Sequence, residues 1–235
     1  MMRLNKYLAS CGIASRRGCD ELIKQGKISV NGKKVVDLAT QVNDDDAVFY
    51  NGQLVQPAQK NIYIMLHKPK GYVTIMSDDL GRKTVADLID TKERVFPIGR
   101  LDYESEGLLL FTNDGELANK LTHPKHEIGK TYVCRISGKI KPQDVKAIRN
   151  GVVLEDGHKT KPALAKVVAG NEHTTRIELT IFEGKNREIR RIFATLGYEV
   201  EFLKRVAIGQ LRLGRLERGK TRSLTIPEIN YLKTL

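Results

Sequence analysis

The amino-acid sequence predicts an α+β protein in two parts: a small N-terminal domain of two helices and a small sheet, then a larger domain built on a mixed, mainly antiparallel sheet. Its 235 residues suffice for one large domain or two small ones with a buried core. The dipeptide Asn-Gly, which favours tight hairpins, occurs twice between short apolar runs, at Asn31-Gly32 and Asn51-Gly52. In the remainder, expected strands outnumber helices and short turns join them, which favours antiparallel neighbours.

Local signals place the elements of the N-terminal domain within residues 1–56. The spacing of apolar residues predicts a first helix near residues 4–8. Ser15 is a good N-cap for a second helix over residues 16–25, which Gly26 would end. The strands expected here cover residues 28–30, 35–36, 47–50 and 54–55.

The second domain is expected to follow a polar linker at residues 57–61 and to cover residues 62–235. Apolar runs predict strands at residues 62–66, 107–111, 131–136 and 176–181. Helical spacing predicts helices at residues 85–89, 116–121, 142–148 and 188–196, and a last one that begins at Pro227. In the helix at 188–196, Ile189, Ile192 and Phe193 have the spacing of core-facing residues.

The chain is strongly basic. It carries 40 Lys and Arg residues against 28 Asp and Glu residues, a formal net charge of +12. Such an excess favours a polyanionic partner, because each neutralised phosphate releases condensed counterions. Charge alone leaves RNA, DNA and anionic lipid open. No apolar run approaches the ~18 residues needed to span a bilayer, and the N-terminus lacks the pattern of a secretory signal.

The cysteines and paired histidines give little sign of disulfide or metal chemistry. Cys11, Cys19 and Cys134 form no CxxC pair, and an odd number makes a poor disulfide framework. A reducing cytoplasm is therefore the expected location. His123 and His126 form an HxxH pair without a third ligand nearby in sequence, so we expect a loop there rather than a metal site.

Basic residues gather around the second expected helix. Ser15-Arg16-Arg17 would place two guanidinium groups beside the free backbone N–H groups of a first helical turn. That combination matches a phosphate diester. Lys24 and Lys27 follow at the end of the helix. Composition alone slightly favours ordinary solvated charges at these positions.

An acidic loop precedes the most apolar of the expected strands. Asp102, Glu104 and Glu106 lie in this loop. A carboxylate at the mouth of a buried strand is held rigidly enough for nucleophilic or acid–base work. Chemistry alone favours the interpretation that all three are surface loop charges.

A second charged segment, EGKNREIRRIF at residues 183–193, carries arginines across a strand-to-helix turn. Arg190 and Arg191 lie beside the buried stripe of the expected helix. An arginine drawn towards a core usually has a carboxylate partner. A basic helix that binds phosphate without a catalytic part explains the pattern equally well.

Two resemblances add to these interpretations. The order RLNKYLAS-x-GIASRR-x(4)-LIKQGKISVNGKKV resembles the small αL-type RNA-binding module shared by a ribosomal small-subunit protein and tyrosyl-tRNA synthetases. GRLDYESEGLLLFTNDG, GKTYVCRI and EGKNREIRRIF resemble, in order, the motifs of the pseudouridine synthase family that modifies ribosomal RNA. The run GELANKLTHP and the NREIRR helix start are most similar to the branch that acts on large-subunit 23S RNA.

The second resemblance implies three roles. Asp102 corresponds to the catalytic aspartate, which attacks either carbon 6 of uracil or carbon 1 of ribose. Tyr132 corresponds to the tyrosine that stacks on the extruded base, and we add the hypothesis that it helps to remove the proton from carbon 5. Arg190 corresponds to the arginine paired with the aspartate, where it would keep Asp102 ionised. Glu104 and Glu106 match nothing catalytic and are expected to be loop residues.

Together these features predict an enzyme that isomerises uridine in structured ribosomal RNA, working as a monomer without cofactor, metal or protein partner. Two alternatives stay open: a non-catalytic ribosome-assembly factor, and the same chemistry on small-subunit 16S RNA. The residues expected to contact RNA are Arg16, Arg17, Lys24, Lys27, Arg100, Lys185, Arg187, Arg191, Lys204 and Arg205.

Overall fold

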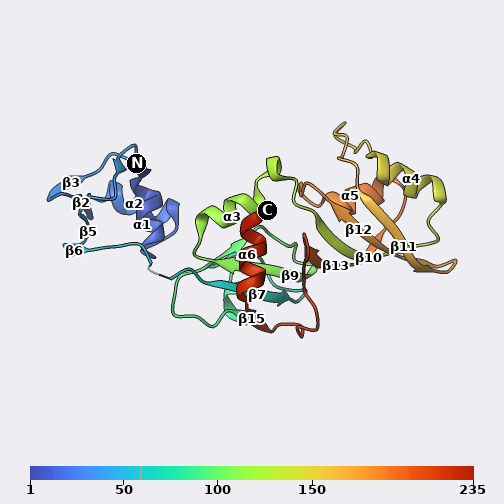
Figure 1. Cartoon of the computed structure of the whole chain (residues 1–235). Coiled ribbons are helices and arrows are strands. Elements are labelled where there is room, and N and C mark those ends of the chain that lie inside the picture. The colour runs from blue at the N-terminus through green and yellow to red at the C-terminus, as the bar shows by residue number, and fades with distance from the viewer. Residues whose placement is uncertain (59) are drawn as a thin grey trace. The chain divides into compact units, whose positions relative to one another are not determined.

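The computed structural model describes residues 1–58 and 60–235, and the chain divides into two compact units (Figure 1). One unit comprises Met1–Ile62 with the short segments Thr91–Val95 and Asn113–Gly115. The other comprises Tyr63–Asp90, Phe96–Thr112 and Glu116–Leu235. The linker predicted at residues 57–61 includes residue 59, which lies outside the described residues.

The first unit contains the two predicted helices and both predicted hairpins. The helices are α1 (Leu4–Ser10) and α2 (Arg16–Lys24). The strands are β1 (Met2–Arg3), β2 (Ile28–Val30), β3 (Lys33–Val35), β4 (Gln41–Val42), β5 (Val48–Tyr50) and β6 (Gln53–Leu54). Four of them form a sheet in the order β3-β2-β5-β6, and β1 pairs with β4.

The local chemistry predicted for the first unit is confirmed. The side chain of Ser15 accepts a hydrogen bond from the backbone N–H of Gly18 at 3.0 Å, so it caps α2. Asn31 and Asn51 both have positive φ angles, as tight hairpin turns require. Leu4, Leu8, Cys19, Ile23, Ile28, Val42 and Val48 form the core of this unit.

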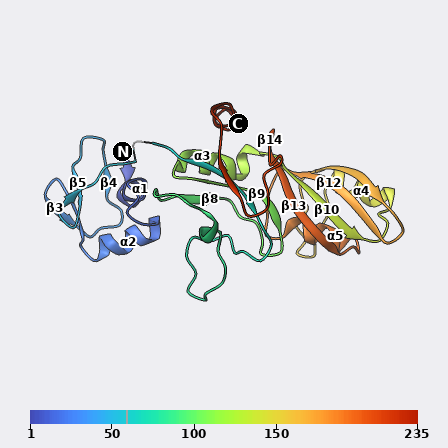
Figure 2. The ribbon, with the colours of Figure 1, turned by 90° about the horizontal axis from the view of Figure 1, so that it is seen from below.

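The second unit is built on a nine-stranded sheet (Figure 2). Its strands are β7 (Tyr63–Lys68), β8 (Phe96–Ile98), β9 (Glu106–Thr112), β10 (Lys130–Ser137), β11 (Leu164–Gly170), β12 (Thr174–Ile181), β13 (Val200–Ile208), β14 (Leu211–Arg212) and β15 (Thr221–Ser223). The order is β11-β12-β10-β13-β9-β7-β15, with β14 paired to β13 and β8 to β9. All neighbours are antiparallel except β9 and β13. The predicted mixed, mainly antiparallel sheet is thus confirmed.

The parallel pair joins the two halves of the sheet over a very short length. Only Glu106 with Lys204 and Gly107 with Arg205 are in register between β9 and β13. Gly107 has a φ of 116° there, and a Cβ atom would lie 2.6 Å from the backbone nitrogen of Arg205. A side chain at this position would therefore separate the two strands.

Helices cover the sheet at the positions that the sequence predicts. They are α3 (Gly115–Thr122), α4 (Pro142–Asn150), α5 (Glu188–Thr195) and α6 (Ile226–Thr234). Short 3₁₀ turns cover Val85–Leu88 and Pro124–His126, so the α-helix predicted at residues 85–89 is only one turn. In the described part of the chain, no helix is long and apolar enough to cross a membrane.

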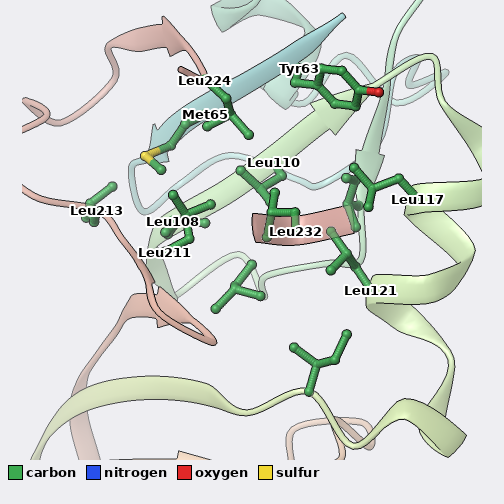
Figure 3. Packing of buried hydrophobic residues seen from close by; sticks show 13 residues of the cluster. Tyr63, Met65, Leu108, Leu110, Leu117, Leu121, Leu211, Leu213, Leu224 and Leu232 are labelled. Atoms are coloured by element: carbon green, nitrogen blue, oxygen red, sulfur yellow. The ribbon is translucent and has the colours of Figure 1, made fainter. Parts of the chain in front are cut away.

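An apolar cluster packs against one face of the sheet, at strand β9. In Figure 3, Leu117 and Leu121 of α3 and Leu232 of α6 pack near Leu108 and Leu110 of β9. All five side chains are buried. Because β9 is clamped between its neighbours and these helices, the loop that leads into it is held by a rigid element.

Replacing Gly107 with alanine is expected to reduce the free energy of unfolding by about 3 kcal/mol, because the new methyl group would overlap the backbone of Arg205. Urea unfolding measures the loss. Gly157→Ala is the matched control: Gly157 also has positive φ but has open space around it, so it should cost about 1 kcal/mol. Equal losses of unfolding free energy for both variants would show that the close approach of β9 and β13 at Gly107 does not make this position more sensitive than an open turn.

Candidate active site

A cavity of about 260 Å³ opens where the two halves of the large sheet meet. Its lining includes the three residues predicted to be catalytic, Asp102, Tyr132 and Arg190, and also Arg205. Apolar side chains complete the wall, among them Leu203. A cavity in which charged and polar groups converge among apolar side chains is a usual form of a binding site for a small ligand group.

The loop that carries Asp102 is fixed through its backbone. Lys68, at the end of β7, is fully buried, and its Nζ donates hydrogen bonds to the carbonyl oxygens of Pro69 (3.1 Å), Asp102 (3.0 Å) and Ser105 (2.9 Å). Burial lowers the pKa of Lys68 to about 8, although the charge of Asp102 acts in the opposite direction. Lys68 thus holds both ends of the turn that presents Asp102.

The side chain of Asp102 is left free by this arrangement. It is partly exposed, and within residues 1–58 and 60–235 no hydrogen bond or ion pair engages its carboxylate. On the preceding residue, the Thr74 hydroxyl donates to the carbonyl oxygen of Leu101 at 2.6 Å. A rigid backbone with an uncommitted carboxylate is the arrangement that a nucleophile needs.

Arg190 and Asp102 line the same cavity but form no direct ion pair. The Arg190 guanidinium donates instead to the carbonyl oxygens of Val200 (2.9 Å) and Glu104 (3.4 Å). Burial lowers the pKa of Arg190, while the nearby charge of Asp102 raises it. The two backbone carbonyls hold the Arg190 guanidinium away from the Asp102 carboxylate. The predicted pair of Arg190 and Asp102 is therefore a charge interaction at longer range and not a direct ion pair.

Tyr132 lies in β10 between its neighbours β12 and β13, opposite Leu179 and Arg205. It is buried, with 7% of its surface exposed. Residues directly opposite on neighbouring antiparallel strands project on the same face. Tyr132 and Arg205 therefore stand side by side in the cavity wall.

Sequence reasoning missed a second group of charges at the cavity. Glu183 and Glu188 are both buried, and their carboxyl groups interact through a hydrogen bond. Glu183 also accepts the backbone N–H of Lys161 at 2.8 Å, and Glu188 that of Lys185 at 2.9 Å. Burial, and then the neighbouring Glu183 carboxylate, raise the pKa of Glu188 to about 7. The only signal in the sequence was their position at a strand-to-helix turn.

Glu106 was predicted to be a loop residue, and this was wrong. It is the first residue of β9 and only 2% exposed. Its carboxylate pairs with Arg218 at 3.1 Å, and the Nε2 of His67 lies 4.0 Å away. The cation that neutralises it comes from more than a hundred residues further along, which no local pattern reveals.

The residues predicted to contact RNA fall into three groups. The exposed ones of the first unit are Arg16, Arg17, Lys24 and Lys27. The exposed ones that line the cavity are Arg100, Lys185 and Arg187. The remaining three are more enclosed: Arg191 pairs with Glu155 and Asp156, Lys204 is half-buried, and Arg205 is 3% exposed.

The described residues bring no obvious metal ligands together. His123 is exposed and His126 half-buried, and their ring centroids lie 6.2 Å apart. Of the side chains that the structure describes, no three or more His, Cys, Asp or Glu are grouped to hold a metal ion.

Glu188→Gln should stabilise the protein at alkaline pH. A carboxyl whose folded pKa exceeds its unfolded value favours folding only while protonated, so the wild type loses stability as pH rises from about 4.5 to about 7. The variant avoids this loss, on the order of 2 kcal/mol. Urea unfolding at pH 5 and pH 8.5 measures the difference.

Glu155→Gln provides the control, because Arg191 lowers the pKa of the exposed Glu155. Removing that carboxylate should give no gain at pH 8.5. A Glu188→Gln variant whose stability relative to wild type did not change between the two pH values would contradict a strained buried carboxyl pair.

Comparisons with known proteins agree across the whole chain. The model of the RNA pseudouridylate synthase family matches residues 62–195, and the S4 domain model matches residues 2–48. The chain is 46% identical over 239 aligned residues to the ribosomal large subunit pseudouridine synthase B of Bacillus subtilis, which covers 100% of this chain and 97% of that protein. An uncharacterized RNA pseudouridine synthase of Aquifex aeolicus is 43% identical, with coverage of 98% and 93%.

A solved structure agrees as well. The crystal structure of a pseudouridylate synthase superposes with a TM-score of 0.72 at 30% identity and covers 99% of this chain and 100% of that one. The sheet whose strand β9 follows the Asp102 loop therefore has the fold of a solved pseudouridylate synthase. By sequence and by structure, this chain belongs to the RNA pseudouridylate synthase family and carries an N-terminal S4 domain.

Proposed function

We propose that this protein isomerises one uridine, or a few neighbouring ones, in large-subunit ribosomal RNA, with Asp102 as the nucleophile. The observation that carries the proposal is the free carboxylate of Asp102 on a loop locked by Lys68 at the mouth of the cavity. The name of the Bacillus subtilis relative, a ribosomal large subunit pseudouridine synthase, supports the choice of RNA.

The reaction moves uracil on its ribose from nitrogen 1 to carbon 5. A base inside a helix is inaccessible, so it is extruded into the cavity at a cost of a few kcal/mol. Asp102 then attacks carbon 6 of the uracil or carbon 1 of the ribose, and the bond from ribose to nitrogen breaks. After the ring turns, carbon 5 bonds to the ribose, the bond between Asp102 and the substrate breaks, and carbon 5 loses its proton, so that the Asp102 carboxylate is regenerated. The net change is an isomerisation that consumes no oxidant or reductant, so the chemistry demands no cofactor.

The other residues support this step by position and charge. Tyr132 stacks on the extruded base from the cavity wall and assists removal of the proton at carbon 5. Arg190 lines the same cavity as Asp102, and its guanidinium places a positive charge near the nucleophile. The S4 domain, with Arg16 and Arg17 at the start of α2, docks on structured RNA through phosphates. The protein acts in the cytoplasm as a monomer.

A tritium-release assay tests the proposal. Ribosomal RNA labelled at carbon 5 of its uridines is incubated with the wild type, with Asp102→Asn and with Glu104→Gln, an exposed carboxylate two residues away. Wild type and Glu104→Gln should release tritium from 23S RNA, and Asp102→Asn should be slower by about 10³-fold or more with RNA binding retained. Tyr132→Phe, included in the same series, should be slower if the hydroxyl assists proton removal.

Each contrary result has a distinct meaning. Release from 16S RNA alone would move the substrate to the small subunit. No release by wild type, from free RNA or from assembling subunits, would leave a binding factor for ribosome assembly. Full release by Asp102→Asn would remove Asp102 as the nucleophile.

A further inference from the structure

Arg205 is a buried cation that the protein itself leaves largely unsatisfied. It is 3% exposed, and its Nε donates to the carbonyl oxygen of Leu108 at 2.7 Å. Its Nη2 is buried and has no hydrogen-bond partner within residues 1–58 and 60–235. Among the residues that the structure describes, no carboxylate lies within ion-pair distance of its guanidinium. A buried charge without a partner is costly, so a group from outside the chain is expected to complete its hydrogen bonds.

The place of Arg205 in the sheet points to that group. Arg205 pairs with Gly107 at the parallel contact between β13 and β9, and Gly107 follows Asp102 by five residues. On its other side, Arg205 lies opposite Tyr132 of β10. It lines the cavity together with both Asp102 and Tyr132. A base that stacked on Tyr132 within reach of Asp102 would therefore lie next to this guanidinium.

A phosphate contact, the role predicted from sequence, fits Arg205 poorly. Side chains alternate between faces along a strand, and Lys204, not Arg205, is the more accessible of the two neighbours. Phosphates remain at the surface when a base is extruded, whereas Arg205 lies in the cavity wall. The uracil ring, which carries two carbonyl oxygens, is the part of the substrate that reaches this depth.

We propose that Arg205 donates hydrogen bonds to a carbonyl oxygen of the extruded uracil and stabilises the negative charge that the ring acquires during the reaction. This inference rests on the proposed uridine isomerisation. Attack of Asp102 at carbon 6 moves the electron pair of the C5–C6 double bond onto oxygen 4. Attack at ribose carbon 1 instead releases uracil as an anion whose charge is shared by oxygens 2 and 4. Arg205 serves either route, because both place charge on a carbonyl oxygen.

The first test separates charge stabilisation from RNA binding. Arg205→Met keeps a long apolar stem without the charge, and Arg176→Met is the control, because Arg176 is an exposed arginine on β12 of the same sheet. Single-turnover rate constants are measured at saturating enzyme, with Kd from filter binding to the same RNA. Arg205→Met should lower the rate constant by about 10²–10³-fold and change Kd by less than about threefold. Arg176→Met should leave the saturated rate constant unchanged.

A second readout separates this role from a merely structural one. Fluorine at carbon 5 makes the uracil anion more stable, so RNA with 5-fluorouridine at the target depends less on a stabilising cation. Conversion of 5-fluorouridine is measured in nuclease digests of the RNA, for the wild type and for Arg205→Met. The factor by which Arg205→Met is slower than the wild type should be at least about tenfold smaller on this RNA than on RNA with uridine. If Arg205→Met does not fold, as judged by circular dichroism, Arg205→Lys is compared in the same way, because a lysine lacks the planar fork of donors.

Two results would overturn the inference: a saturated rate constant near that of wild type with weakened binding, or equal deficits on uridine and 5-fluorouridine. The first would return Arg205 to phosphate binding, and the second would make it structural. Failure of the proposed function is recognised separately, because the wild type would then release no tritium from any ribosomal RNA.

Discussion

The contact between Gly107 and Arg205 determines where the functional cavity lies. At this point β9 and β13 run parallel for only two residue pairs, between two antiparallel halves of the sheet. Because Gly107 has no side chain, the strands approach closely enough for the Arg205 guanidinium to hydrogen-bond the backbone of β9. The Asp102 loop precedes β9, so the same contact sets the distance between the carboxylate and the cavity wall.

Charge in this cavity is distributed unevenly. The described cations that line it or hold its loops are Lys68, Arg100, Lys130, Lys185, Arg187, Arg190 and Arg205. The Nζ of Lys68 donates hydrogen bonds to three backbone carbonyls, whereas the Nη2 of Arg205 has no acceptor among the described residues. Burial also lowers the pKa of Lys130, and the charge of Arg205 lowers it further. Among the described residues that line the cavity, cations outnumber the carboxyl groups of Asp102, Glu183 and Glu188. Such a site is prepared for a ligand that brings or develops negative charge.

Features that depend on residues close in sequence could be predicted, whereas features that depend on contacts between distant segments could not. The two Asn-Gly hairpins, the Ser15 cap and the buried face of α5 depend on neighbours in sequence, so the pattern alone locates them. Strand β13 escaped prediction because Lys204 and Arg205 interrupt its apolar alternation. The unusual burial of Arg205 depends on its pairing with β9, which lies about a hundred residues earlier.

The candidate site divides in the same way. Resemblance of motifs located Asp102, Tyr132 and Arg190, and the structure places all three around one cavity. The lock formed by Lys68, the carboxyl pair of Glu183 and Glu188, and the ion pair of Glu106 arise from contacts across the fold. Such contacts have no period or motif in the sequence, because the partners are set by strand order rather than by spacing.

The measurement that tests the account most directly is an experimental structure of the Asp102→Asn protein bound to a stem-loop of 23S RNA that contains the target uridine. The account predicts one uridine turned out of the stack, with its ring on Tyr132, a carbonyl oxygen at hydrogen-bond distance from Arg205, and residue 102 beside the glycosidic bond. An RNA held on the surface with every base stacked and the cavity empty would contradict it.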